Sequence, residues 1–130
     1  MLLSYFILTH QLYICHNKKS GCIKHFLQDD NINYNNFSQL QLDGQEFSNL
    51  IELEELHLNQ NYLEKLPDGL FLHINMLKKL FLFSNNLEYL GSNTLEGLVN
   101  LSALLINNNL LRSFSDSTFS PVSNLRKLLV

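Results

Sequence analysis

The sequence lacks the features that most directly identify membrane, nucleic-acid-binding and disordered proteins. No apolar run reaches the roughly 20 residues that a membrane helix needs, so we expect no transmembrane span within this chain. The net charge is −3, which is too weak a balance to favour nucleic acid or an anionic membrane surface as a partner. With 45% hydrophobic and 16% charged residues, the 130-residue chain is instead predicted to fold as one compact domain.

Cysteine is also scarce, and the apolar start of the chain does not read as an ordinary secretory signal. Cys15 and Cys22 could close a small disulfide loop outside the cell, and two reduced cytosolic thiols are an open alternative. Adding His16 or His25 gives no usual zinc spacing, so we expect no metal or cofactor. The N-terminal apolar run lacks basic residues and a small-residue cleavage site, and His10 interrupts it. A signal and a buried N-terminal strand both stay open as interpretations.

What the sequence does contain is a repeat with a period of 24 residues. Three complete units begin at Leu53, Leu77 and Leu101, and a partial unit begins at Leu125. The first 14 residues of the complete units read LEELHLNQNYLEKL, LKKLFLFSNNLEYL and LSALLINNNLLRSF, and the partial unit reads LRKLLV. Positions 1, 4, 6, 11, 14, 19 and 22 are apolar in every complete unit, where the background rate is 45%. Such a match excludes coincidence.

The repeat predicts stacked coils, each with one short strand. The two leucines of L-x-L point to the same side of an extended chain, because side chains alternate along a strand. One strand cannot bury that side alone, so successive units must cover one another in a parallel sheet. The remaining apolar positions turn the chain back behind the sheet, where one residue of each unit is expected to stack in a spine: Phe47, Phe71, Leu95 and Phe119.

Position 9 of each unit is asparagine, at the point where the strand ends and the chain turns inward. Buried backbone groups in such a turn have no partner in the sheet. An asparagine amide offers both donors and an acceptor, so it can bond to its own turn and to the adjacent one. We therefore expect a structural asparagine ladder made of Asn35, Asn61, Asn85 and Asn109.

The pattern L-x-x-L-x-L-x-x-N-x-L resembles the leucine-rich repeat family, in its typical 24-residue class. The resemblance implies an α/β, β-dominated solenoid: a right-handed horseshoe fragment with a parallel β-sheet on the concave face and a mostly irregular or 3-10 convex side. It divides the chain into repeats 27–52, 53–76, 77–100 and 101–124 with a partial unit 125–130, preceded by an N-terminal segment 1–26 that is a signal or a partial N-terminal cap. Members of this class are mostly extracellular or at the cell surface, and a cytoplasmic location is the alternative.

Candidate binding residues occupy the strand positions that face away from the leucine core. Phe81 and Phe83 alternate with core leucines and are therefore expected to point outward, with Leu105 beside Phe81 on the next strand. Such an outward apolar patch is typical of an interaction surface. His57 shares this face, and a stripe of alternating charge that includes Glu55 and Lys79 could orient a partner or could be a set of solvated ion pairs.

These features predict a protein–protein interaction module. We expect part of the ectodomain of a secreted or membrane-anchored leucine-rich repeat receptor or adhesion-type protein, which binds a protein ligand or co-receptor on its concave face. An intracellular leucine-rich repeat regulatory scaffold is the alternative, and an accessory domain of an enzyme is a third hypothesis. The chain itself is not expected to be an enzyme, because no phosphate loop, nucleophile elbow or metal motif accompanies its histidines.

Two further expectations concern glycosylation and the C-terminal edge. Asn36 and Asn100 each begin a glycosylation sequon, which matters if the protein is secreted. The sequence ends at 128–130, within the strand of a new unit, and no capping segment follows. The chain is therefore expected to be a fragment of a longer protein that self-associates through its uncapped C-terminal edge.

Overall fold

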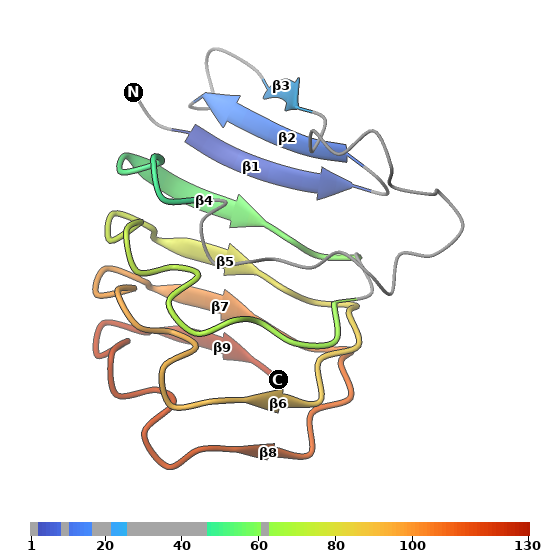
Figure 1. Ribbon diagram of the computed structural model, residues 1–130, viewed down its shortest axis with the longest axis vertical. Helices are drawn as coiled ribbons and strands as arrows, with labels where there is room; N and C mark the ends of the chain where they lie inside the picture. The colour runs from blue at the N-terminus through green and yellow to red at the C-terminus, as the bar shows by residue number, and fades with distance from the viewer. Residues whose placement is uncertain (1–2, 9–10, 17–21, 26–46, 61–62) are drawn as a thin grey trace.

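One seven-stranded sheet forms one side of the molecule (Figure 1). The computed structural model describes residues 47–60 and 63–130, together with the strands within residues 3–8, 11–16 and 22–25. The order across the sheet is β3 (Cys22–His25), β2 (Gln11–His16), β1 (Leu3–Leu8), β4 (Leu53–His57), β5 (Lys79–Phe81), β7 (Ala103–Leu105) and β9 (Lys127–Leu129). Strands β1, β4, β5, β7 and β9 run parallel to one another, whereas the pairs β1–β2 and β2–β3 are antiparallel.

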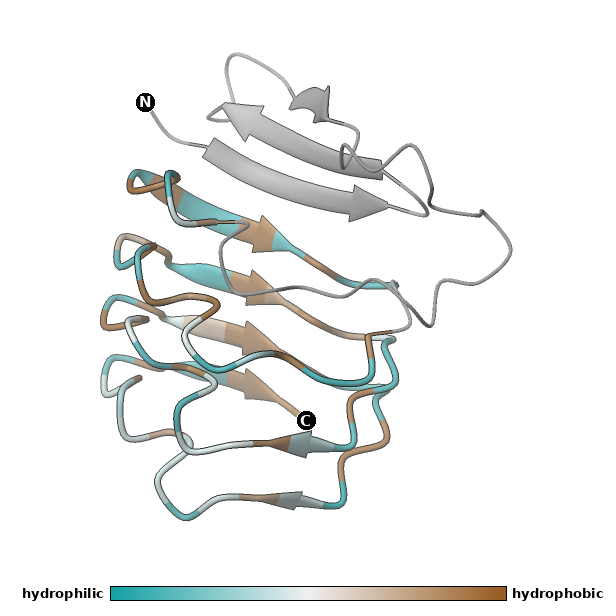
Figure 2. Cartoon of the chain, in the orientation of Figure 1, coloured by the Kyte–Doolittle hydropathy of each residue, from teal (hydrophilic) through white to brown (hydrophobic). Residues whose placement is uncertain are grey.

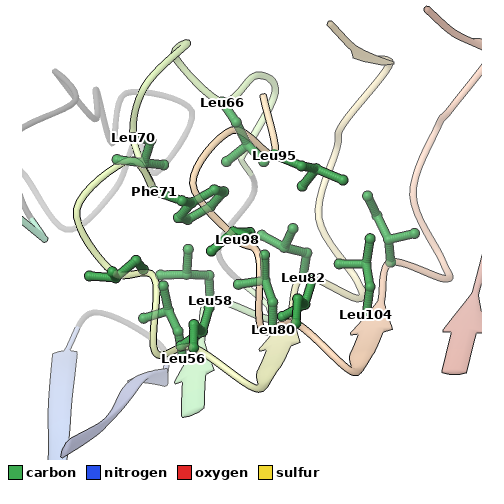
Figure 3. Packing of buried hydrophobic residues seen from close by; sticks show 14 of the residues in the cluster. Leu56, Leu58, Leu66, Leu70, Phe71, Leu80, Leu82, Leu95, Leu98 and Leu104 are labelled. Atoms are coloured by element: carbon green, nitrogen blue, oxygen red, sulfur yellow. The ribbon is translucent and has the colours of Figure 1, made fainter. Parts of the chain in front are cut away.

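The 24-residue period sets the register of the parallel strands. Leu56, Leu80 and Leu104 are direct partners on β4, β5 and β7, and each is 0% exposed. Figure 3 shows these three leucines projecting from successive strands into one shared core. Burying a leucine side chain contributes about 1.5–3 kcal/mol, so the repeated leucines are the main source of stability in this region.

The predicted spine lies behind the sheet. Phe47 and Phe71 stack with ring centroids 6.2 Å apart and planes 13° from parallel, and Leu95 continues the buried line. Phe119 is half-buried and meets Phe114 edge to face at 5.3 Å. The spine is therefore buried from Phe47 to Leu95 and loses burial at Phe119, in the last complete unit.

The convex side consists of turns and bends with one short parallel pair of strands, β6 (Tyr89–Leu90) and β8 (Ser113–Phe114). This pair was not predicted from the sequence. In the part of the chain that the structure describes there is no helix, and so none that could span a bilayer. Thr118 is fully buried here, and its hydroxyl lies 3.1 Å from the carbonyl oxygen of Leu90 in the preceding unit.

Asn85 and Asn109 make equivalent hydrogen bonds in successive units. Asn85 Oδ1 accepts from the backbone N–H of Leu63 at 3.0 Å, and its Nδ2 donates to the carbonyl oxygens of Leu58 and Leu82, each at 2.9 Å. Asn109 Oδ1 accepts from Leu87 N–H at 3.0 Å, and its Nδ2 donates to Leu82. Asn35 and Asn61, the other two members of the expected ladder, lie outside the described residues.

The residue just before each ladder position adopts a left-handed backbone conformation. The φ angles of Gln60, Ser84 and Asn108 are 60°, 57° and 56°. This conformation lets the chain leave the strand and turn inward, and it costs about 1–2 kcal/mol for a residue with a Cβ atom. The turn is repeated at the same position in three units, so it belongs to the fold.

The two ends of the repeat array differ from its middle. The place next to β4 is taken by β1, so an N-terminal strand adjoins the repeats directly, and most of the expected unit 27–52 lies outside the described residues. At the other end, Leu128 occupies the position of Leu104 but is 40% exposed, and Phe114 is 38% exposed. Core positions therefore lose burial where no further unit covers them.

Candidate ligand-binding face

Strands β4, β5, β7 and β9 present ordered rows of side chains on the face opposite the leucine core. The register sets the rows, because directly opposed residues in a ladder project to the same side of a sheet. The central row consists of His57, Phe81, Leu105 and Leu129. Beside it runs the inner charged row of Glu55, Lys79, Ala103 and Lys127. The outer charged row lies at the starts of the strands, where backbone hydrogen bonds connect Glu54, Lys78, Ser102 and Arg126 in turn.

The central row is aromatic at β4 and β5 and aliphatic at β7 and β9. The rings of His57 and Phe81 stack with centroids 4.1 Å apart and planes 13° from parallel. Leu105 is half-buried beside Phe81, and Leu129 is 42% exposed. Figure 2 shows β5 and β9 changing from hydrophilic to hydrophobic along their length, and the central row lies at the hydrophobic end of both strands. On its other side β4 pairs with β1, where the backbone partner of His57 is Phe6.

Phe83 follows the end of β5 and is half-buried. Its carbonyl oxygen accepts from Gln60 N–H at 3.1 Å, so the inter-strand bonding continues past the strand. One residue, Leu82, separates Phe83 from Phe81, which places both phenylalanines on the same side of the extended chain. The structure thus places Phe81, Phe83 and Leu105 together, and the exposed parts of these side chains form a candidate contact surface.

The charges on β4 and β5 are paired across the strands. Lys79 Nζ lies 2.5 Å from Glu55 Oε1, and Lys78 Nζ lies 2.6 Å from Glu54 Oε1. Partly exposed pairs of this kind add about 0–1 kcal/mol to stability. Their main effect is to neutralise this half of the charged rows. The Glu54–Lys78 pair was not predicted from the sequence, although the two residues are 24 positions apart and therefore lie next to each other in successive units.

Glu55 also approaches His57, with 3.6 Å between Oε2 and Nε2. Burial alone raises the pKa of Glu55, but the hydrogen bond and charge of Lys79 and the nearby His57 outweigh this, and the pKa lies below its ordinary value. Burial lowers the pKa of His57, and the attraction of Glu55 opposes this without cancelling it. His57 is therefore neutral at pH 7, and it contributes an uncharged aromatic surface to the central row.

The sequon at Asn100 is built into the contact between two units. Asn100 Nδ2 donates to the carbonyl oxygen of Asn75 at 2.8 Å, and the hydroxyl of Ser102 donates to that of Lys78 at 3.0 Å. Asn100 is exposed, and an amide nitrogen that carries a glycan keeps one hydrogen for such a bond. The fold is thus compatible with a glycan at Asn100. Asn36 lies outside the described residues.

Cys15 and Cys22 are backbone partners across the antiparallel pair β2–β3. Opposed residues in such a pair have Cα atoms about 4.5–5.5 Å apart, which is within the range of disulfides. This register keeps the pair as a candidate disulfide. Among the described residues, no group of three or more His, Cys, Asp and Glu side chains is arranged to hold a metal ion.

The stacked coils, the parallel sheet over a leucine core and the bonded asparagines define a leucine-rich repeat solenoid. The chain is a leucine-rich repeat protein. Its coils follow the same 24-residue period along residues 53–124. No model of a known protein family matches the sequence.

Known proteins similar to this chain include receptors that are much longer. Human Toll-like receptor 5 is 47% identical over 49 residues, which cover 38% of this chain and 6% of the receptor. The crystal structure of a TLR13–ssRNA13 complex superposes with a TM-score of 0.61 at 32% identity, over 63% of this chain and 11% of that one. The leucine-rich repeat domain of APL1B superposes with a TM-score of 0.65 at 25% identity, over 69% of this chain and 28% of that one.

Proposed function

We propose that this chain is a protein-binding module whose ligand, a protein or co-receptor, docks on the concave face at the central row. The observation that carries the proposal is the stack of His57 on Phe81, which continues to Leu105 on the next strand. Partly exposed aromatic side chains held on a rigid sheet are typical binding hot spots, because little side-chain entropy is lost on docking. We assign no enzymatic step to this face.

The test compares the proteins captured by immobilised wild-type chain with those captured by two variants. Phe81→Ala with Phe83→Ala removes the concave aromatic surface, and we expect it to weaken ligand binding by more than about 2 kcal/mol. Tyr89→Ala removes an aromatic side chain of similar size from the convex pair and is the matched control. A ligand that binds the concave variant as tightly as the wild type would discard the site while leaving the fold intact.

We further propose that the chain belongs to a receptor or adhesion-type ectodomain outside the cell or at its surface. Similarity to Toll-like receptor 5 supports this location, and the opposed Cys15 and Cys22 suit an oxidising compartment. Expression in mammalian cells provides the test. We expect the protein to appear in the medium with both thiols protected from alkylation. We also expect a glycosidase to shift its electrophoretic mobility, and Asn36→Gln or Asn100→Gln to remove that shift. Cytosolic protein with two free thiols would favour the intracellular scaffold.

The outer edge of β9 supports a further proposal about association of the chain with itself. Leu128, Leu129 and Val130 are 40%, 42% and 64% exposed, although Leu128 occupies a core position. An exposed apolar strand edge favours pairing with a second copy. Sedimentation velocity should show concentration-dependent association that Leu128→Lys reduces. A monomer at all accessible concentrations would contradict the proposal.

A further inference from the structure

The two charged rows repeat the same order of side chains from β4 to β9. Each begins with a glutamate on β4, followed by a lysine, a small residue and a cation. The inner row lies on β5, β7 and β9, and the outer row lies one residue before each of these strands. Arg126 and Lys127 are therefore neighbours at the end of both rows, and both are exposed. Their backbone N–H groups donate to the carbonyl oxygen of Ser102 at 2.9 and 3.0 Å, which fixes the two residues at the start of β9.

These two cations carry the net charge of the face. Glu54 and Glu55 are each within 2.6 Å of a lysine, Lys78 just before β5 or Lys79 on it, so these four charges cancel locally. Strands lie about 4.8 Å apart, which puts β9 roughly 14 Å from β4. That separation exceeds the screening length of about 8 Å at physiological ionic strength, so the glutamates do not offset Arg126 and Lys127.

Both charged rows carry a residue with a short side chain near Leu105. Ser102 and Ala103 are half-buried and have short side chains, whereas Leu105 and Leu129 extend from the adjacent row. A ligand that covers Leu105 and Leu129 thereby reaches Lys127 directly, without displacing a large side chain.

We infer that the concave face binds a protein segment in which apolar side chains lie along the central row and carboxylates meet Arg126 and Lys127. The inference rests on the proposed function and specifies the chemistry of its ligand. Apolar contact with Phe81 and Leu105 supplies most of the binding energy, and the charge contact orients the segment so that its acidic end lies over β9.

Single-stranded nucleic acid is the competing class of ligand, because bases stack on aromatic rings and phosphates meet cations. The face favours an acidic protein instead. A nucleic-acid strand needs a basic groove along its whole length, and here the aromatic end of the central row lies beside Glu54 and Glu55. The net charge of −3 also opposes binding of a polyanion.

The experiment selects random linear peptides displayed on phage against the full 130-residue chain and measures the affinity of the enriched peptides. Arg126→Glu with Lys127→Glu reverses the concave charge, and Arg126→Gln with Lys127→Gln removes it more conservatively. Arg112→Glu is the matched reversal at an exposed cation near Glu88, 3.9 Å away, outside the charged rows. Thermal melts confirm that each variant is folded, and a fluorescent oligouridine serves as the nucleic-acid probe.

We expect acidic peptides with apolar residues to be enriched on the wild type and on the Arg112 variant. Their affinity should fall at least about tenfold in the Arg126 and Lys127 reversal variant, fall less in the glutamine variant, and weaken with added salt. Peptides that need Phe81 and Phe83 but show no charge preference would overturn this inference and leave the proposed function standing. Tighter binding of oligouridine than of the selected peptides, lost on charge reversal, would also overturn the inference. Selected peptides that ignore Phe81 and Phe83, or no enrichment at all, would overturn both.

Discussion

Replacing Asn85 with leucine tests whether the asparagine ladder stabilises the fold. Asn85 is 4% exposed, and its side chain bonds to backbone groups of Leu58, Leu63 and Leu82. In Asn85→Leu the N–H of Leu63 loses the acceptor at 3.0 Å, and the carbonyl oxygens of Leu58 and Leu82 each lose a donor. Leu82 keeps the bond from Asn109 at 3.0 Å, so its loss is partial.

The orphaned Leu63 N–H dominates the cost of Asn85→Leu, because a buried donor without a partner costs about 1–3 kcal/mol. The added leucine methyl groups restore little of this, since they enter a site shaped for a planar amide. We therefore expect the free energy of unfolding to fall by about 2–3 kcal/mol. Urea denaturation followed by circular dichroism measures this, with an unchanged m-value indicating that the compactness of both states is preserved.

Asn109→Leu is the matched control for Asn85→Leu. It removes equivalent bonds to Leu87, Leu82 and Ile106, but Asn109 is only half-buried. Water can then reach the released groups, so we expect about half the loss. An Asn85 variant with a loss below about 0.5 kcal/mol, or one no less stable than the Asn109 variant, would refute the reasoning that ladder bonds stabilise through burial.

Three further tests, with five substitutions, concern other parts of the fold. Gly97→Ala places a Cβ 2.7 Å from the backbone of Leu72 at a φ of +90°, so we expect the free energy of unfolding to fall by about 2–4 kcal/mol. Gly69→Ala, at a φ of +76° with no atom nearby, should cost about 1 kcal/mol in the same denaturation assay. Equal costs would contradict the close packing of Gly97 on Leu72. Thr118→Val removes the buried hydroxyl and should cost about 1 kcal/mol, a loss that Thr118→Ser should mostly avoid in melts of both variants. The pKa of His57 is depressed in the folded state, so the unfolded chain takes up a proton first as the pH falls. Stability should therefore fall as the pH drops below about 6.5. In His57→Phe this part of the pH dependence should disappear from melts recorded between about pH 5 and 7.

The concave rows show how far the sequence alone could go. The period of one unit was enough to predict that Leu105 lies beside Phe81, because a constant period forces equivalent residues into register. The same period left two alternatives open for Glu55 and Lys79, a charge stripe that orients a partner and a solvated ion pair, since ion pairing depends on side-chain conformations that the pattern does not fix; in the structure the two residues are paired. Of the predicted charge stripe, Lys127 is left as an exposed cation, next to the exposed Arg126 of the outer row.

The sequence determined the coil length, the leucine core and the identity of the outward residues, because alternation along a strand and repetition between units are local properties of the chain. The tertiary structure alone decided the stack of His57 on Phe81, the close approach of Gly97 to Leu72 and the burial of Thr118. Each of these depends on how one coil sits against the next, at distances that sequence spacing leaves open. For the same reason Leu104 is fully buried while Leu128, its equivalent, is not: burial is set by the neighbouring unit and not by the residue itself.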